Sequence, residues 1–259
     1  MALTRYTIKV EYIGKNYAGS QNQPEGIVTV QSELEKALST LIGDTEQKVA
    51  GVTNNRKRIK TVFSGRTDKG VNSKGQIVHF ESEKTLVASK FMHSLNEILP
   101  ADISVSDLKE VTTDFHAQKS AKKRSYQYVF YNKKQRSAFD GGLLLIKWDL
   151  DIQRMQQSIE YLLGEHDFRS FESSGSTTQN KTCFIYKVEC KKLDDTVVID
   201  IVGNRFLYNM VRAIVGTLLL IEKDDLEPQT MKEILDSKDR SKAGKTVSPY
   251  GLTLMKVEY

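Results

Sequence analysis

The chain has 259 residues, of which 38 are Lys or Arg and 33 are Asp or Glu, for a formal net charge of +5. Hydrophobic residues at 39% and charged residues at 27% exclude an intrinsically disordered or membrane-embedded protein and predict a globular one. Seven basic residues and no acidic one fall between Lys119 and Arg136, so the rest of the chain is slightly acidic. This local basicity indicates a polyanionic partner, although a solvated charge run would give the same pattern.

Two cysteines, Cys183 and Cys190, are too few for a disulfide framework and are not spaced like a zinc pair. We interpret them as ordinary strand residues of a protein in a reducing compartment. The N-terminal sequence lacks the apolar stretch of a secretory signal, and the most apolar segment, 206–221, is too short to span a bilayer. The sequence therefore predicts a cytoplasmic protein without a membrane anchor.

The first half of the chain predicts the order strand, helix, two strands, helix, strand. Alternation of apolar and polar residues favours strands, whereas apolar residues three or four apart favour helices. The predicted elements are a strand at 6–12, a helix at 30–41, strands at 61–64 and 75–80, a helix at 88–99 that Pro100 ends, and a strand at 103–111.

The second half predicts the same order with one additional helix. Its elements are a strand at 125–131, a helix at 152–163, strands at 181–190 and 196–202, helices at 206–221 and 228–235, and a strand at 251–257. Two such passes predict an α+β fold of two ferredoxin-like (RRM-like) units with antiparallel sheets side by side. We place the domains at 1–114 and 115–259.

The segment 64–71, with the sequence SGRTDKGV, is the first candidate site. It sets one carboxylate, Asp68, between Arg66 and Lys69, and nearby cations favour the ionised form of an aspartate. Such a carboxylate could act as a nucleophile or a base. The alternative is a β-turn whose aspartate bonds to its own backbone. A phosphate-binding loop is excluded because Lys and Ser or Thr do not follow Gly70.

The basic segment carries aromatic residues among its cations. On a strand, Tyr126, Tyr128 and Phe130 share one face. Cations that bind phosphates beside aromatics that stack on bases are typical of proteins that bind single-stranded RNA or a flipped base. The alternative is that these rings pack in the core, and we assign only one of them to a ligand.

An arginine on an apolar helix is the third signal. Phe206, Met210, Ile214 and Leu218 repeat every four residues, and Arg212 lies on the flank of this helix. A guanidinium there requires a carboxylate or phosphate partner, for which Asp68 is one candidate, or else it extends to solvent. The four histidines have no second ligand at metal spacing, so neither a metal nor a hydrolase triad is predicted.

Together these segments resemble the tRNA pseudouridine synthase A family, nearly from end to end. The matching pieces are 12–14, 19–21, 29–31, 34–38, 65–71 with 75–76, 95–96, 99–103, 114–117, 123–126, 164–168, 206–207 with 210–212, and 249–252. Each piece alone is weak, but their common order makes the resemblance specific.

The resemblance implies an isomerase without metal or organic cofactor that turns uridine into pseudouridine in the anticodon stem-loop of tRNA, at positions 38–40. Asp68 matches the catalytic aspartate of the family, Tyr126 a tyrosine that stacks on the target base, and Arg212 an arginine that pairs with the aspartate. Arg66 lies in the same loop, and Lys122, Lys123 and Arg124 are expected to contact RNA phosphates. A homodimer that binds the anticodon arm is also implied.

Four positions depart from the pattern of the family: Ser20, Gln118, Lys119 and Cys183. None is one of the three matched site residues, so we expect an active enzyme in which Gln118 and Lys119 could alter the contacts with RNA. The alternatives are a catalytically silent RNA-binding protein on the same scaffold and a related synthase that acts on other RNA uridines.

Overall fold

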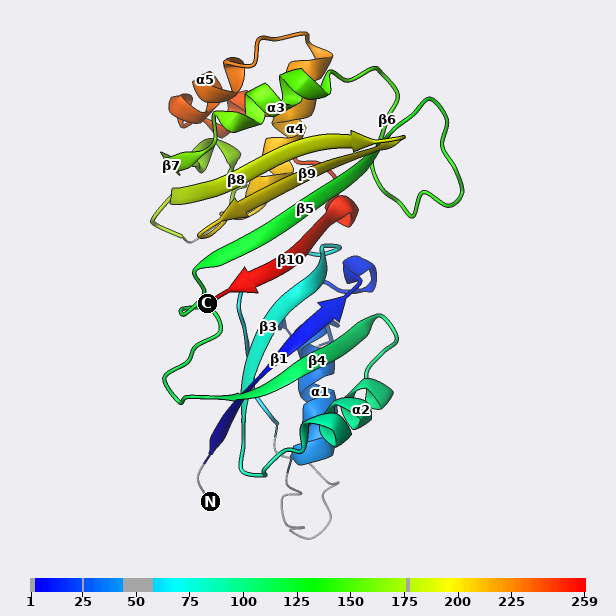
Figure 1. Cartoon of the computed structure of the whole chain (residues 1–259), viewed down its shortest axis with the longest axis vertical. Helices are drawn as coiled ribbons and strands as arrows, with labels where there is room; N and C mark the ends of the chain where they lie inside the picture. Colours follow the sequence, from blue (N-terminus) through cyan, green and yellow to red (C-terminus); the bar gives the residue numbers. More distant parts are fainter. Residues whose placement is uncertain (1–2, 25, 44–57, 176–177) are drawn as a thin grey trace. The chain divides into compact units, whose positions relative to one another are not determined.

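In the computed structural model, which describes residues 3–24, 26–43, 58–175 and 178–259, the chain is mixed α+β and forms two compact units (Figure 1). The first unit runs to Ala121 and also includes Tyr259, and the second is Lys122–Glu258. No helix among these described residues is both long and apolar enough to cross a membrane.

The first unit is an antiparallel sheet covered by two helices (Figure 1). Along the chain its elements are β1 (Thr4–Tyr12), α1 (Val30–Ile42), β2 (Thr61–Phe63), β3 (Asn72–Ser82), α2 (Ala88–Ile98) and β4 (Ile103–Val111). The sheet order is β4-β1-β3, and β2 pairs with β3. In order of appearance the strands are therefore arranged fourth, first, third, second, as in a ferredoxin-like unit.

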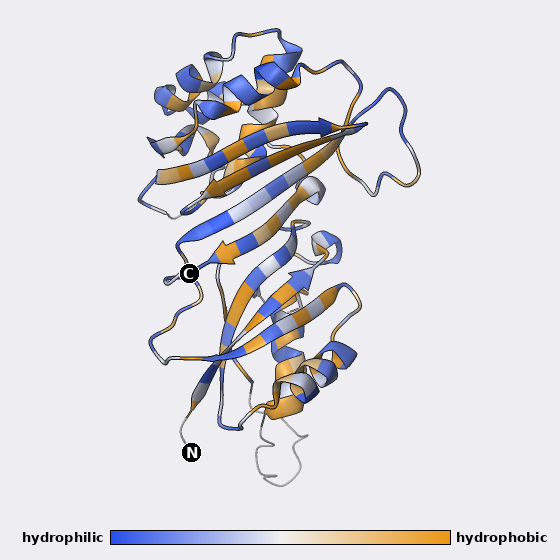
Figure 2. Ribbon diagram, viewed as in Figure 1, coloured by the Kyte–Doolittle hydropathy of each residue, from blue (hydrophilic) through white to orange (hydrophobic). Residues whose placement is uncertain are grey.

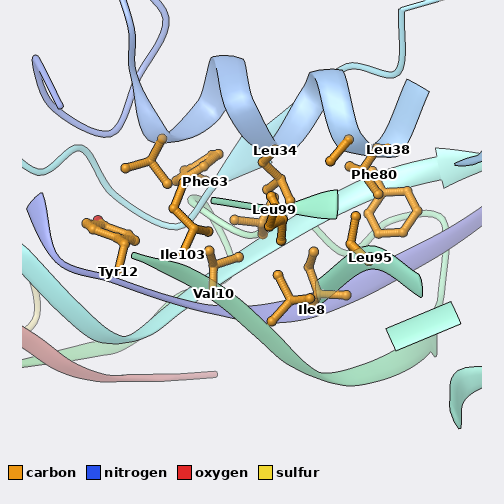
Figure 3. Close-up of a cluster of buried hydrophobic side chains, with 14 of the residues drawn as sticks. Ile8, Val10, Tyr12, Leu34, Leu38, Phe63, Phe80, Leu95, Leu99 and Ile103 are labelled. Carbon is orange, nitrogen blue, oxygen red and sulfur yellow. The ribbon is translucent and has the colours of Figure 1, made fainter. Parts of the chain in front are cut away.

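The core of the first unit lies between α1 and the sheet (Figure 3). Alternate residues of β1, among them Ile8 and Val10, are fully buried, as the period of a strand requires. Leu34 and Leu38, one helical turn apart, cover them from α1. The helix begins at a capping box in which Thr29 and Ser32 exchange side-chain-to-backbone hydrogen bonds.

The second unit repeats the same strand order. Its elements are β5 (Lys123–Asn132), β6 (Leu145–Ile146), α3 (Ile152–Glu160), β7 (Gly164–Asp167), β8 (Thr182–Leu193), β9 (Thr196–Gly203), α4 (Met210–Lys223), α5 (Thr230–Ser237) and β10 (Leu252–Glu258). The antiparallel sheet runs β10-β5-β9-β8-β7, and the short β6 lies parallel to β5. Figure 2 shows the apolar character of α4, whose Ile214 and Leu218 are fully buried.

The predicted fold class and element order are confirmed, with one clear error. The helix predicted at 206–221 begins only at Met210. Asn209 has a φ of 60°, and a residue with this left-handed backbone interrupts a right-handed helix, so residues 206–209 are not part of α4. The short strands β6 and β7 were not predicted. Cys183 and Cys190 are buried residues of β8 that form no disulfide, in agreement with their interpretation as strand cysteines.

Candidate active site

The segment with Asp68 is a loop that connects β2 to β3 in the first unit. Asp68 is half-buried, whereas its neighbours Arg66 and Lys69 are exposed. The loop returns to the sheet at Gly70, whose φ of 83° is the left-handed backbone that glycine adopts without strain. The backbone N–H of Val71 donates to the carbonyl of Asp68 at 3.1 Å, so the aspartate does sit at the start of a tight turn.

The residue before the aspartate, Thr67, is almost completely buried and holds the loop in place. Its N–H donates to Ser20 Oγ at 2.8 Å, and its carbonyl accepts from the N–H of Ser20 at 3.0 Å. Its hydroxyl lies 2.8 Å from that of Tyr12, where burial raises the pKa of the tyrosine and so keeps the phenol neutral. We call Tyr12, Ser20 and Thr67 the loop clamp.

The loop clamp connects the loop to two regular elements. Tyr12 ends β1, and the carbonyl of Ser20 accepts from the N–H of Gln31 in the first turn of α1 at 3.0 Å. On the other side of the loop, Gln76 of β3 donates from Nε2 to the carbonyl of Gly65 at 2.8 Å. A half-buried carboxylate is therefore presented on a loop fixed from both sides, which is the preorganisation that a reacting group requires.

Tyr126 and Arg124 lie on β5 in the second unit. Tyr128 and Phe130 on the same face are fully buried, as the core alternative expects. Tyr126 is only half-buried, with its ring edge-on to Phe206 at 5.1 Å between centroids. Of these three aromatics it is thus the one that retains surface for a ligand.

The three basic residues at the start of this strand differ in their surroundings. Lys122 is exposed, Lys123 lies 4.7 Å above the ring of Tyr186, and Arg124 donates from Nη1 to the carbonyl of Asn204 at 2.7 Å. Figure 2 shows the beginning of β5 as hydrophilic. This end of the strand offers a cationic surface beside aromatic rings.

Arg212 belongs to the first turn of α4 and is held by hydrogen bonds rather than extended into solvent. Its Nε donates to the carbonyl of Val247 at 2.8 Å, and its Nη1 donates to Asn209 Oδ1 at 2.6 Å. The segment before Val247 approaches the helix closely because Gly216 and Gly244 have no side chains to hold the two backbones apart. A Cβ on Gly216 would lie 1.8 Å from the carbonyl oxygen of Lys245.

The structure thus places Asp68 and Arg66 in the first unit, and Tyr126, Arg212, Lys122, Lys123 and Arg124 in the second. Sequence reasoning missed Tyr12 and Asn209 and noticed Ser20 only as a departure from the family pattern. The contact between Ser20 and Thr67 spans 47 positions of the sequence, and no local pattern signals it.

Comparisons with known proteins identify relatives of the chain along nearly its whole length. A family model described as tRNA pseudouridine synthase matches residues 159–259. The chain is 41% identical to a tRNA pseudouridine synthase A of Caldicellulosiruptor saccharolyticus, over 97% of this chain and 98% of that protein. It is 39% identical to one of Colwellia psychrerythraea, over 98% and 93%. A solved Cbf5-Nop10-Gar1 complex matches at 13% identity, over 83% of this chain and 44% of that one, with a TM-score of only 0.38.

Proposed function

The chain belongs to the tRNA pseudouridine synthase A family and is an isomerase that acts on tRNA uridine, and from this premise we propose that Asp68 carries the chemistry on a uridine of the anticodon stem-loop. The observation that carries the proposal is the loop clamp, which fixes the half-buried Asp68 between exposed cations. A binding surface for a phosphate-rich ligand gains nothing from a carboxylate held in this way.

The reaction breaks the bond between ribose C1′ and uracil N1, turns the base, and joins C1′ to C5. The proton on C5 must leave and N1 must gain one, so the overall composition does not change. A carboxylate can attack the sugar or the base, or act as a base on the ribose, and the proposal assigns Asp68 to this set of roles.

Tyr126 and Arg212 are proposed to serve the same nucleotide from the second unit. Tyr126 is only half-buried, and a ring that stacks on the target base must reach the protein surface. The guanidinium of Arg212 is oriented by Asn209 and Val247, which suits it to bind a carboxylate or phosphate. Its pairing with Asp68 is part of the proposal.

Lys122, Lys123 and Arg124 are proposed to contact the phosphates of the anticodon arm, with Arg66 as a further contact beside Asp68. Replacement of Lys122, Lys123 and Arg124 by Ala is expected to weaken tRNA binding and to reduce the slope of log K against log salt by about one unit per lost contact. Measurement of binding over a range of salt checks this, and an unchanged slope would move the RNA site elsewhere.

The proposal also includes a homodimer in the cytoplasm and domains at 1–114 and 115–259. Mapping pseudouridine in unmodified tRNA after exposure to the purified protein tests the substrate position directly. New pseudouridine in the anticodon arm is the expected result. Pseudouridine at other positions would identify a synthase of different specificity, and none at all would refute the proposal.

A further inference from the structure

The end of the basic segment leads into a long connection between β5 and β6, which we call the β5–β6 arm and define as residues 133–144. Figure 1 shows it as a wide excursion beyond the end of the sheet in the second unit. It carries Lys133, Lys134 and Arg136, the basic residues for which the proposed function has no role.

The arm has an ordered tip, and Asp140 organises it. One oxygen of this carboxylate accepts from Lys133 Nζ at 2.6 Å and the other from the N–H of Ser137 at 2.7 Å. The side chain of Asp140 is only 13% exposed. The N–H of Phe139 donates to Ser137 Oγ at 3.2 Å, and the N–H of Leu143 donates to the carbonyl of Asp140 at 3.1 Å. The direction in which residue 139 projects is therefore defined.

Phe139 projects into solvent from this tip and is 94% exposed. No other large apolar side chain in the described ranges is exposed by more than 65%, the value for Val87. A single exposed apolar residue is ordinary. Here, however, hydrogen bonds fix the backbone beside the exposed ring, and proteins that bind single-stranded nucleic acid present such aromatic rings for bases to stack on. The ring offers both faces to a planar partner.

A basic hollow lies at the base of the arm. It has a volume of about 450 Å³, and its lining includes Lys133, Lys134, Lys147, Lys192, Asp149 and Asp195. These lysines come from the arm, from the segment after β6 and from the end of β8. Lys133 pairs with Asp140 and Lys134 with Asp149, while Lys147 and Lys192 have no ion-pair partner in the part of the chain that is described. An anion would relieve the repulsion among these cations.

We propose that the β5–β6 arm binds an unpaired stretch of RNA, with a phosphodiester in the basic hollow and a nucleobase stacked on Phe139. This inference rests on the proposed function, which supplies RNA as the ligand, and adds a contact outside the proposed active site. A second copy of the chain is disfavoured as the occupant because arm-to-arm contact would bring the cations of two tips together.

Three variants of one residue test the stacking. Alanine at a base-stacking position weakens binding by roughly 5- to 150-fold, so we expect Phe139→Ala to lose about tenfold or more in tRNA affinity. Phe139→Leu, which is apolar but cannot stack, should lose as much, whereas Phe139→Trp should bind as the native protein does. Val87→Ala is the matched control at another exposed apolar position, and its affinity should not change. Fluorescence anisotropy with labelled tRNA measures all four.

Two results would overturn the stacking. Native affinity in Phe139→Ala would show that the ring is not used. Full affinity in Phe139→Leu, or a change of oligomeric state in Phe139→Ala by sedimentation, would show an apolar contact with protein instead.

The basic hollow is tested by Lys147→Gln and Lys192→Gln, which remove charge from its lining without removing an ion pair among the described residues. Each lost phosphate contact to a single strand should lower the salt slope of binding by about 0.7. An unchanged slope in both would overturn the phosphate contact. If the native protein isomerises tRNA while every arm variant binds normally, only this inference fails. If the native protein binds no tRNA, the proposed function fails with it.

Discussion

Asn209 is a small residue on which the position of Arg212 depends. Its φ of 60° directs the chain into α4, while its side chain accepts from Arg212 Nη1 and donates to Ser173 Oγ at 3.0 Å. Asparagine tolerates this backbone better than most residues with a side chain. One residue thus sets both the start of the helix and the orientation of the guanidinium.

Substitution of Asn209 should separate these two effects. Both Asn209→Gly and Asn209→Ala lose the bond to the guanidinium, worth about 1.5–3 kcal/mol for a charged partner, so we expect both to lower kcat by at least about tenfold. Both variants lose the hydrogen bonds of the Asn209 side chain, but alanine should lose roughly 1 kcal/mol more folding free energy than glycine, because it resists positive φ. Single-turnover kinetics and urea unfolding measure the two. Native kcat in Asn209→Gly would contradict the positioning role.

His79 on β3 predicts how stability depends on pH. Burial, together with the charge of Arg5, lowers the pKa of this histidine from 6.5 to about 4, and its Nδ1 accepts from the N–H of Ala117 at 3.1 Å. The folded protein therefore keeps the ring neutral, while the unfolded chain takes up a proton below pH 6.5. This contribution is complete above pH 6.5 and is lost as the pH falls towards 4.

The loss should amount to about 2–3 kcal/mol between these limits. In His79→Gln, which has no proton to gain, the free energy of unfolding should depend less on pH over the same window. Urea unfolding of both proteins at several pH values makes the comparison. Identical pH profiles for the two proteins would show that His79 does not titrate differently on folding.

At the scale of elements, the loop clamp joins the start of α1 to the loop that carries Asp68. Ser20→Ala leaves the buried N–H of Thr67 without its hydroxyl acceptor, which should cost about 1–3 kcal/mol. We also expect a lower kcat, because the Asp68 loop loses its fixed position. Ser39→Ala is the matched control, since Ser39 Oγ accepts from the N–H of Ile59 at 2.9 Å in the same unit.

Both serine variants should therefore be less stable, but only Ser20→Ala should turn over more slowly. Enzyme assays at a temperature where each variant is fully folded make this comparison. Equal kcat in the two variants would mean that the loop clamp supports the fold and not the reaction.

The elements could be predicted where a periodic pattern decides them. The alternation of Ile8 and Val10 placed β1, and the strand predicted at 103–111 is β4 (Ile103–Val111). The start of α4 could not be predicted, because no periodic pattern signals the left-handed backbone of Asn209 or the bond of its side chain to Ser173, 36 positions away in the sequence. The two-residue strand β6 is too short to show any period.

At the scale of the whole molecule, some residues of the candidate site could be predicted from the sequence, whereas the contacts that hold them in place could not. Asp68 between two cations, and Arg212 on an apolar helix, are visible in the chain because their charges contrast with their neighbours. Ser20 and Tyr12 could not be recognised in this way, because their neighbours in the sequence do not indicate that their side chains bond to Thr67. The family resemblance led us to propose Asp68 as the reacting residue, and the structure shows which contacts hold its loop.

The account as a whole rests on Asp68 as the reacting group of a tRNA-uridine isomerase. The most direct test incubates unmodified tRNA with native protein, Asp68→Ala and the nearly isosteric Asp68→Asn, and then quantifies pseudouridine by mass spectrometry beside equilibrium tRNA binding. Native protein should form pseudouridine, and both variants should form none while they still bind tRNA. Pseudouridine formation by either variant at the native rate would contradict the account.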